Sequence, residues 1–100
     1  MTPGRRIPYP GGDPAFLLER AGDYCGPVSG YTGAGIPAVF FLLPNARDQD
    51  SKGGKRAIHH VCSPPHRFVE NPDGTLSIFD SIGADPHWHG FLENGNWRPA

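Results

Sequence analysis

The sequence predicts a small, mainly β protein built as an antiparallel meander of hairpins, with long loops and at most one short N-terminal helix. Two turn signals carry this prediction: Asn71-Pro72-Asp73-Gly74 and Asn94-Gly95. In the first turn, proline sets φ and glycine accepts a positive φ. The second is a preferred sequence for a two-residue type I′ turn. The two hairpins lie close together in the second half of the chain.

The composition indicates a folded domain rather than a disordered chain. The chain has 100 residues, which suits one domain with a modest core, so we expect residues 1–100 to form a single domain. Glycine and proline number 14 and 12, but 37% of the residues are hydrophobic and the net charge is only −1. Disordered chains usually have few aromatics and a high net charge. This charge gives no electrostatic case for nucleic acid or an anionic membrane surface as partner.

The first third of the chain is rich in proline and glycine. Residues 1–14 read as an irregular arm, since proline is unfavourable in a helix interior and in a central strand. Pro14 to Ala21 is the best helical candidate, with Asp13 as N-cap and Gly22 at its end. Gly26 to Gly35 reads as a glycine-punctuated loop.

The most apolar stretch, Ile36 to Leu43, contains Val39-Phe40-Phe41 and predicts a strand. Residues 45–55 are polar, and we expect a mobile loop there. Residues 56–98 form the predicted hairpin core. Its expected strands are Ala57–Cys62, His66–Glu70, Thr75–Asp80 (with Leu76 and Ile78 on one face), His87–Glu93 and Asn96–Arg98.

All five histidines fall between positions 59 and 89, and Cys62 lies among them. Because side chains alternate along a strand, His60 and Cys62 share one face while His59 and Val61 take the other. We therefore expect His59 to be exposed.

His87 and His89 also point the same way, one pleat apart, where two imidazoles can reach one ion. A thiolate with imidazoles suits zinc better than calcium or magnesium. The sequence therefore predicts a zinc site whose ligands are Cys62, His66, His87 and His89, with His60 as the alternative ligand. The competing interpretation is that the histidines are packed or exposed and that Cys62 is a small buried hydrophobe.

The run from His66 to Trp97 resembles a group of short, uncharacterised bacterial and phage proteins. That group carries an H-x-V-x-E-x-x-D-G-T-[IL] hairpin, a strand ending in a P-S-I-like triplet, and a W-H-G-[FY]-L-x-x-G-x-W C-terminus. The corresponding pieces here are His66 to Leu76, Asp80-Ser81-Ile82 and Trp88 to Trp97. Asp80 departs from the pattern, which usually has proline. The label ammonia monooxygenase that some members carry is set aside.

The resemblance implies a zinc-ribbon-type β protein of phage or bacterial origin, with no established activity. His66 and His89 are the polar positions that it supports best, and Cys62 with His87 would complete a set of four ligands. It covers about a third of the chain and little of the first 55 residues.

The first four residues lack the order of a secretory signal, and no apolar run approaches a membrane span. We therefore expect the cytoplasm, of the host cell if the protein is phage-encoded. In that reducing compartment, Cys25 and Cys62 are expected as thiols or metal ligands rather than a disulfide.

Four protein ligands would close a tetrahedral zinc site, which favours a structural role over catalysis. The first hypothesis is thus a metal-stabilised interaction or accessory module that binds a protein partner. Trp88, Phe91 and Trp97 could be its aromatic anchors, or they could simply pack in the core. We assign no catalytic residue.

Three alternatives stay open. One is a virion or assembly protein without metal. Another is a metal-dependent enzyme of cupin-like chemistry, in which His87, His89 and Glu93 would be ligands. The last is a Cys62 nucleophile activated by His60 or His66.

Overall fold

The computed structural model describes residues 1–12, 17–30, 35–45, 58–84 and 88–100. These residues form strands, and no helix occurs among them, so the mainly β prediction is confirmed. The strands are β1 (Thr2–Pro3), β2 (Arg5–Arg6), β3 (Asp23–Val28), β4 (Ala38–Phe41), β5 (His59–Cys62), β6 (Arg67–Glu70), β7 (Leu76–Ala84), β8 (Trp88–Glu93) and β9 (Asn96–Pro99).

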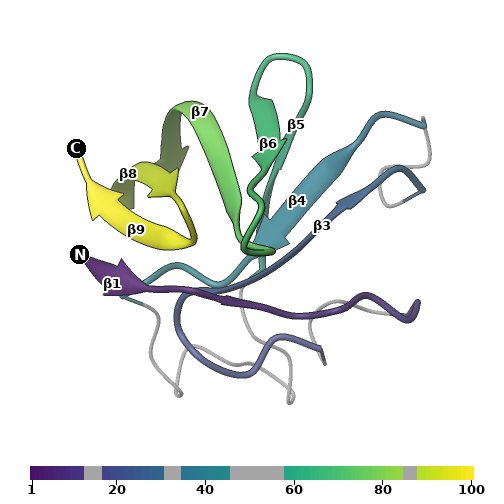
Figure 1. Ribbon diagram of the computed structural model, residues 1–100, viewed down its shortest axis with the longest axis horizontal. Helices are drawn as coiled ribbons and strands as arrows, with labels where there is room; N and C mark the ends of the chain where they lie inside the picture. The colour runs from purple at the N-terminus through teal and green to yellow at the C-terminus, as the bar shows by residue number, and fades with distance from the viewer. Residues whose placement is uncertain (13–16, 31–34, 46–57, 85–87) are drawn as a thin grey trace.

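The strands form two sheets that pack against each other (Figure 1). Sheet A has the strand order β1-β9-β8-β7-β6, and sheet B has the order β2-β3-β4-β5. Neighbouring strands are antiparallel except β2 and β3, which run parallel. The N-terminal segment joins both sheets, because β1 pairs with β9 and β2 pairs with β3.

Both predicted hairpins are confirmed. In the β6–β7 turn, the Gly74 backbone N–H donates to the Asn71 carbonyl at 2.9 Å, and Gly74 has a φ of +86°. In the β8–β9 turn, Asn94 and Gly95 have φ values of +48° and +77°, the signs that a type I′ turn requires. The sequence placed β7 too short: the strand continues to Ala84 through an irregularity between Ile78 and Ile82.

The inner faces of the two sheets share one hydrophobic core, centred on Trp97. Its indole ring lies against Tyr24 and Phe41 of sheet B, with ring centroids 6.3 and 5.1 Å away, and edge-on to Trp88 at 5.7 Å. Its Nε1–H donates to the Gly22 carbonyl at 2.8 Å. The other buried members are Val39, Leu43, Leu76, Ile78, Ile82 and Leu92.

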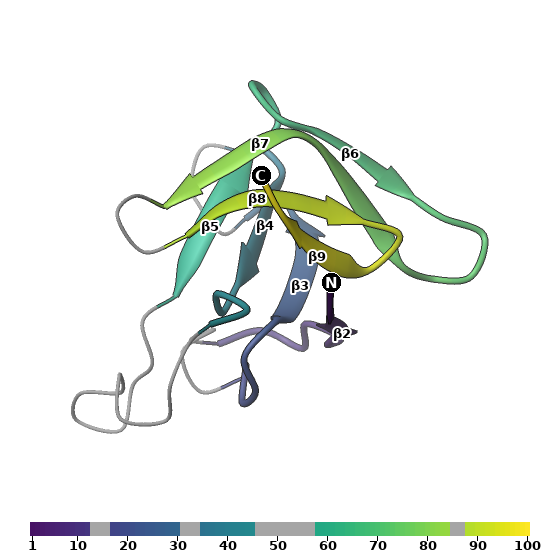
Figure 2. The same cartoon turned by 90° about the vertical axis from the view of Figure 1, so that its left-hand side faces the viewer.

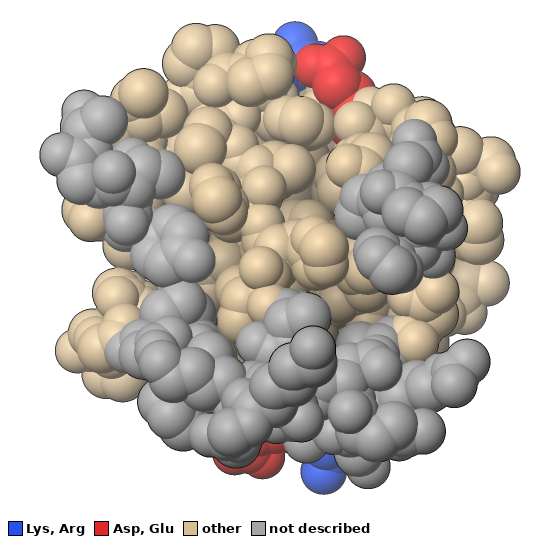
Figure 3. All heavy atoms as spheres, turned by 180° about the vertical axis from the view of Figure 1, so that it is seen from behind, with Lys and Arg blue, Asp and Glu red and all other residues tan. Residues whose placement is uncertain are grey.

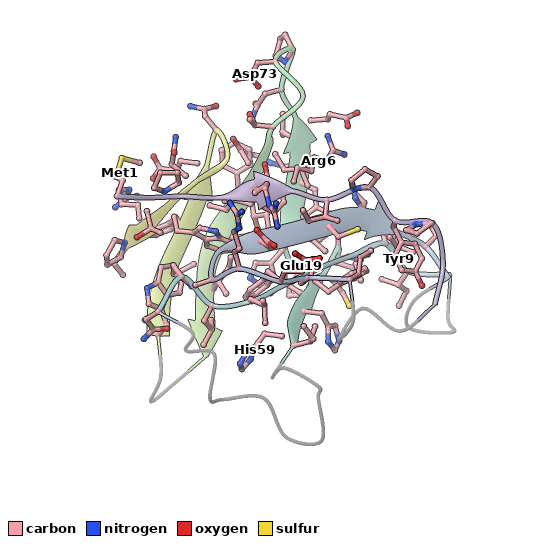
Figure 4. All side chains as sticks on the ribbon, turned by 90° about the horizontal axis from the view of Figure 1, so that it is seen from below. Met1, Arg6, Tyr9, Glu19, His59 and Asp73 are labelled. Atoms are coloured by element: carbon pink, nitrogen blue, oxygen red, sulfur yellow. The ribbon has the colours of Figure 1, made fainter. Side chains whose placement is uncertain are left out.

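A second hydrophobic cluster lies on the outer face of sheet B. Phe40 and Cys25 are 0% exposed there, together with Leu18 and Leu42. Ile7, Tyr9 and Leu17 pack over this cluster. Figure 4 shows the N-terminal segment crossing in front of β3, with Arg6 and Tyr9 along it. The chain thus covers the outer face of sheet B with its own N-terminal residues.

The predicted helix from Pro14 to Ala21 is not formed in its described part, residues 17–21. The buried carboxylate of Asp23 accepts hydrogen bonds from the backbone N–H groups of Glu19 and Arg20, at 3.0 and 2.9 Å. It also receives the Arg5 guanidinium at 2.8 Å. These bonds satisfy backbone donors that a helix would otherwise use, so a turn forms instead. Residues 13–16 lie outside the described part of the chain.

Two further expectations need correction. The loop predicted from Gly26 begins inside β3, because a bulge between Cys25 and Val28 admits Gly26-Pro27 to the strand. Gly26 has a φ of +129°, which suits glycine. The predicted irregular arm also contains β1 and β2, both at sheet edges where proline is tolerated. The loop predicted at 45–55 falls almost wholly on residues 46–57, outside the described ones.

Candidate functional site

The predicted alternation along β5 holds, but the exposure expected for His59 is not found. Val61 packs on the shared core, whereas Cys62 and His60 pair with Ala38 and Phe40 on the other face of sheet B. His59 is half-buried and stacks on Phe41, with ring centroids 6.2 Å apart. The expectation that His59 is exposed is therefore wrong, because the edge of the shared core reaches it. His60 is the exposed member of the pair.

Cys62 and His66 lie at the two ends of one tight turn. The His66 backbone N–H donates to the Cys62 carbonyl at 2.9 Å. The His66 Nε2 atom lies 3.2 Å from the Ser81 carbonyl oxygen, which can only accept, so Nε2 carries the hydrogen. In the neutral form of the ring the lone pair is then on Nδ1, a buried atom without a hydrogen-bond partner among the described residues. Such a nitrogen is free to ligate a metal ion.

The structure does not bring His89 to this turn. His89 is exposed on the outer face of sheet A, opposite Gly83 of β7. Cys62 faces outward from sheet B, on the other side of the shared core. Among the described residues, no three His, Cys, Asp or Glu side chains are grouped closely enough to hold an ion. His87 lies outside those residues, so the four-ligand set remains a prediction.

Two members of the cupin-like ligand set, His89 and Glu93, also lie apart from each other. His89 and Glu93 lie on the same face of β8, but four residues of strand span about 13 Å. Phe91 stands between them on that face, and the Glu93 carboxylate accepts a hydrogen bond from Arg98. These two side chains cannot share one ion in this arrangement.

The three predicted partner anchors divide between core and surface. Trp97 is fully buried, so its indole has no surface to offer a partner. Trp88 is half-buried and packs on the shared core. Phe91 alone points outward, because Leu92 beside it faces the core.

Phe91 belongs to a row of four side chains that crosses the outer face of sheet A, which we call the Arg–Phe row. Register pairs Arg67 with Phe79 and Phe91 with Arg98. Ile78 pairs with Leu92, which brings the next residues, Phe79 and Phe91, beside each other on neighbouring strands. The row is therefore Arg67, Phe79, Phe91 and Arg98, on β6, β7, β8 and β9.

Each ring of the row is covered by a guanidinium group. The Arg67 Cζ atom lies 4.6 Å from the Phe79 centroid, and the Arg98 Cζ atom lies 4.5 Å from the Phe91 centroid. Even so, Phe79 is 42% exposed, and Val69 beside it on β6 is 38% exposed. Figure 2 shows β6 to β9 from the side that carries this face. By contrast, the face seen from behind in Figure 3 has few charged side chains among the described residues.

Phe79 was not among the residues predicted for a binding surface, although the sequence carries a signal for it. Leu76 and Ile78 were placed on one face of their strand, and alternation then puts Ser77 and Phe79 on the other face. The outward direction of Phe79 could thus be predicted from alternation, whereas its position beside Phe91 depends on the pairing of β7 with β8.

A groove of about 530 Å³ lies between the N-terminal segment and the bulge of β3, lined by Arg6, Ile7, Pro8, Tyr9, Gly26, Pro27 and Val28. Its polar groups are engaged within the protein. The Arg6 guanidinium donates to the Gly26 and Gly74 carbonyls at 3.0 and 2.8 Å, and the Tyr9 hydroxyl donates to the Gly12 carbonyl at 2.8 Å. This groove therefore presents little chemistry to a ligand.

The two cysteines are free thiols in different environments. Burial raises the pKa of Cys25 to about 11, although Arg6 acts in the opposite direction. Cys62 is half-buried. A buried, protonated thiol is a poor nucleophile, so Cys25 is a structural residue of the second cluster.

No helix among the described residues has the length and apolar character to cross a membrane. Comparisons with protein-family models, curated proteins and solved structures found no match. The resemblance seen in residues 66–97 therefore stays a prediction.

Proposed function

We propose that this protein is a small protein-binding module and that the outer face of sheet A, centred on the Arg–Phe row, is its binding surface. The observation that carries the proposal is the row itself: two phenylalanines on neighbouring strands, each ring covered by an arginine, on a face that no described segment covers. Aromatic and arginine side chains are enriched at protein interfaces and among their energetic hot spots.

The geometry of the face supports this role. Neighbouring strands hold the four side chains in register, so little conformational freedom is lost when a partner docks. Phe79 and Val69 provide exposed apolar area, and the guanidinium groups provide hydrogen-bond donors around it.

The test is capture of a partner from a bacterial lysate, the source that the resemblance implies, by wild type and two variants. Phe79→Ser removes a central ring, whereas Ile36→Ser removes an equally exposed apolar side chain, 39% against 42%, outside the row. The proposal expects Phe79→Ser to weaken capture by about tenfold or more and Ile36→Ser to leave it unchanged. Equal capture by Phe79→Ser and wild type would reject the face.

A zinc site is a second candidate, and the Nδ1 atom of His66, which has no hydrogen-bond partner in the described part of the chain, favours it. Such a site would use His66 and Cys62, with any further ligand coming from outside the described residues, where His87 lies. Zinc bound there would brace the turn after β5 and stabilise the domain.

Elemental analysis of purified protein tests this candidate. Wild type should contain close to one zinc per chain, His66→Gln should lose it, and the matched control His60→Gln should retain it. Wild-type protein without zinc would reject the site.

A further inference from the structure

We propose that the partner of the Arg–Phe row supplies an extended acidic strand that adds to sheet A along β6. This inference rests on the proposed function and names the kind of partner that the face would take. β6 (Arg67–Glu70) is the last strand of sheet A, and no described strand pairs with its outer edge. Such an edge is a template for strand addition.

The hydrogen-bond pattern of the β6–β7 hairpin identifies the free backbone groups. The Asn71 N–H donates to the Thr75 carbonyl at 2.8 Å, so Asn71 faces β7. Residues of an antiparallel strand alternate between facing their partner and facing away from it. Val69 and Arg67 therefore also face β7, while the N–H and C=O groups of Phe68 and Glu70 point to the open edge.

The free edge of sheet B is less suited to strand addition. The Ser63 N–H donates to the Pro37 carbonyl at 3.0 Å, so by the same alternation the backbone of Cys62 points away from β4. Its carbonyl already accepts the His66 N–H at 2.9 Å. The turn thus occupies part of that edge, and β6 is the better template.

The side chains of β6 define the chemistry of the added strand. On the outer face, alternate residues of that strand would lie beside Arg67 and Val69. Among the described residues no carboxylate pairs with Arg67, whereas Arg98 has Glu93 and Arg6 has Glu70. A carboxylate beside Arg67 and an apolar side chain beside Val69 complete the face.

Charge and ring geometry favour an acidic peptide over single-stranded nucleic acid. Bases stack on open aromatic faces, but here guanidinium groups lie over both rings. A carboxylate can bind the guanidinium edge without displacing it from the ring. The net charge of −1 also provides no general attraction for a phosphate backbone.

The experiment is an NMR titration of the full chain with an end-blocked peptide of repeating Thr-Glu-Thr-Val. We expect amide shifts along β6 and at Phe79, and affinity at least about tenfold higher than for the same peptide with Lys replacing Glu. Equal affinity for the two peptides would overturn the proposal. So would row shifts caused by oligothymidylate in the absence of shifts caused by the acidic peptide.

Two variants locate the added strand. Glu70→Pro removes an outward N–H but no ladder hydrogen bond, and edge strands tolerate proline. We expect it to bind the peptide about tenfold more weakly, while the control Glu70→Gln, which keeps the N–H, stays within about twofold. If Glu70→Pro does not fold, protection of the Phe68 and Glu70 amides from hydrogen exchange by the peptide decides the matter, and absence of protection overturns strand addition.

The variants Phe79→Ser and Glu70→Pro distinguish a failure of the binding face from a failure of strand addition. Loss of the captured partner by Phe79→Ser but full retention by a folded Glu70→Pro would overturn strand addition and leave the binding face standing. Unchanged capture by Phe79→Ser would overturn the binding face itself.

Discussion

The two sheets share one core but differ in how their outer faces meet solvent. On sheet B, Phe40 is 0% exposed because Tyr9, Ile7 and Leu17 lie over its cluster. On sheet A, Phe79 keeps 42% of its surface exposed, and the Arg67 guanidinium group lies over its ring. An apolar sheet face can thus be buried permanently under the chain or shielded by a side chain that a partner can engage. The second arrangement is the one suited to binding.

The largest expected difference between the faces is in the cost of removing a ring. Phe40→Ala should lower the free energy of unfolding by about 3–5 kcal/mol, because it leaves a cavity in a fully buried cluster. Phe79→Ala should lower it by less than about 1 kcal/mol, since nearly half the ring already meets water. Urea unfolding of both variants measures the contrast, and equal losses would contradict it.

The next effect concerns the hydrogen bonds of the Asp23 carboxylate to Arg5 and to two backbone N–H groups, which we call the clamp. Asp23→Ala removes a 1% exposed carboxylate that holds Arg5 and two backbone N–H groups, and should cost about 2–3 kcal/mol. Arg5→Ala should cost less than Asp23→Ala, because the Arg5 side chain is 44% exposed and water screens its ion pair. Thermal unfolding compares the two, and a larger loss for Arg5→Ala would contradict the assignment of Asp23 as the centre of the clamp.

Substitutions of Tyr9 test whether its ring covers the outer face of sheet B. Its ring meets Phe40 edge-on with centroids 5.3 Å apart, so Tyr9→Ala should cost about 1–2 kcal/mol and increase binding of a hydrophobic dye. Tyr9→Phe keeps the ring and loses only an exposed hydrogen bond to Gly12, so it should differ little from wild type. Dye binding by Tyr9→Phe as strong as that by Tyr9→Ala would show that the ring is not the cover.

The smallest expected effect is a pH dependence of the free energy of unfolding that comes from Asp23, on sheet B. Burial raises the pKa of Asp23, but hydrogen bonds from Arg5 and from the Arg20 and Glu19 backbone outweigh it, so the pKa lies below the ordinary 3.8. A depressed pKa means that this stabilisation is complete well above pH 3.8 and is lost as the pH falls below that value. The free energy of unfolding, measured by urea at several pH values between 6 and 3, should therefore fall less for Asp23→Asn than for wild type.

Much of the C-terminal meander could be predicted from sequence because its signals are local. Asn94-Gly95 suits the positive φ values of a type I′ turn, and Gly74 suits the positive φ that its turn requires. The missed strand β3 depends on tertiary context instead. Gly26-Pro27 predicts a loop by propensity, yet pairing with β4 holds it in a bulged strand. The helix predicted from Pro14 fails for a similar reason, because Asp23 is close to Glu19 and Arg20 in a turn.

The candidate site was less predictable than the fold, because it depends on which faces meet across the core. Alternation correctly separated His59 from Cys62, but no local rule places Cys62 and His89 on outward faces of different sheets. Phe91 and Trp97 were named together as possible anchors, yet Phe91 lies on an outward face whereas Trp97 is the centre of the core. The Arg–Phe row needs the register of β6 to β9, which emerges only when all four strands pair.

The position of Trp97 makes the chain its own optical reporter. The sequence has two tryptophans, and they meet edge-on at 5.7 Å, with Trp97 also touching rings from sheet B. Indoles so close couple electronically, and burial in this cluster shields Trp97 from water. Circular dichroism would follow the indole pair within sheet A, while a red shift of fluorescence would signal separation of the sheets. Separation of the two sheets during unfolding could thus be followed without any added dye.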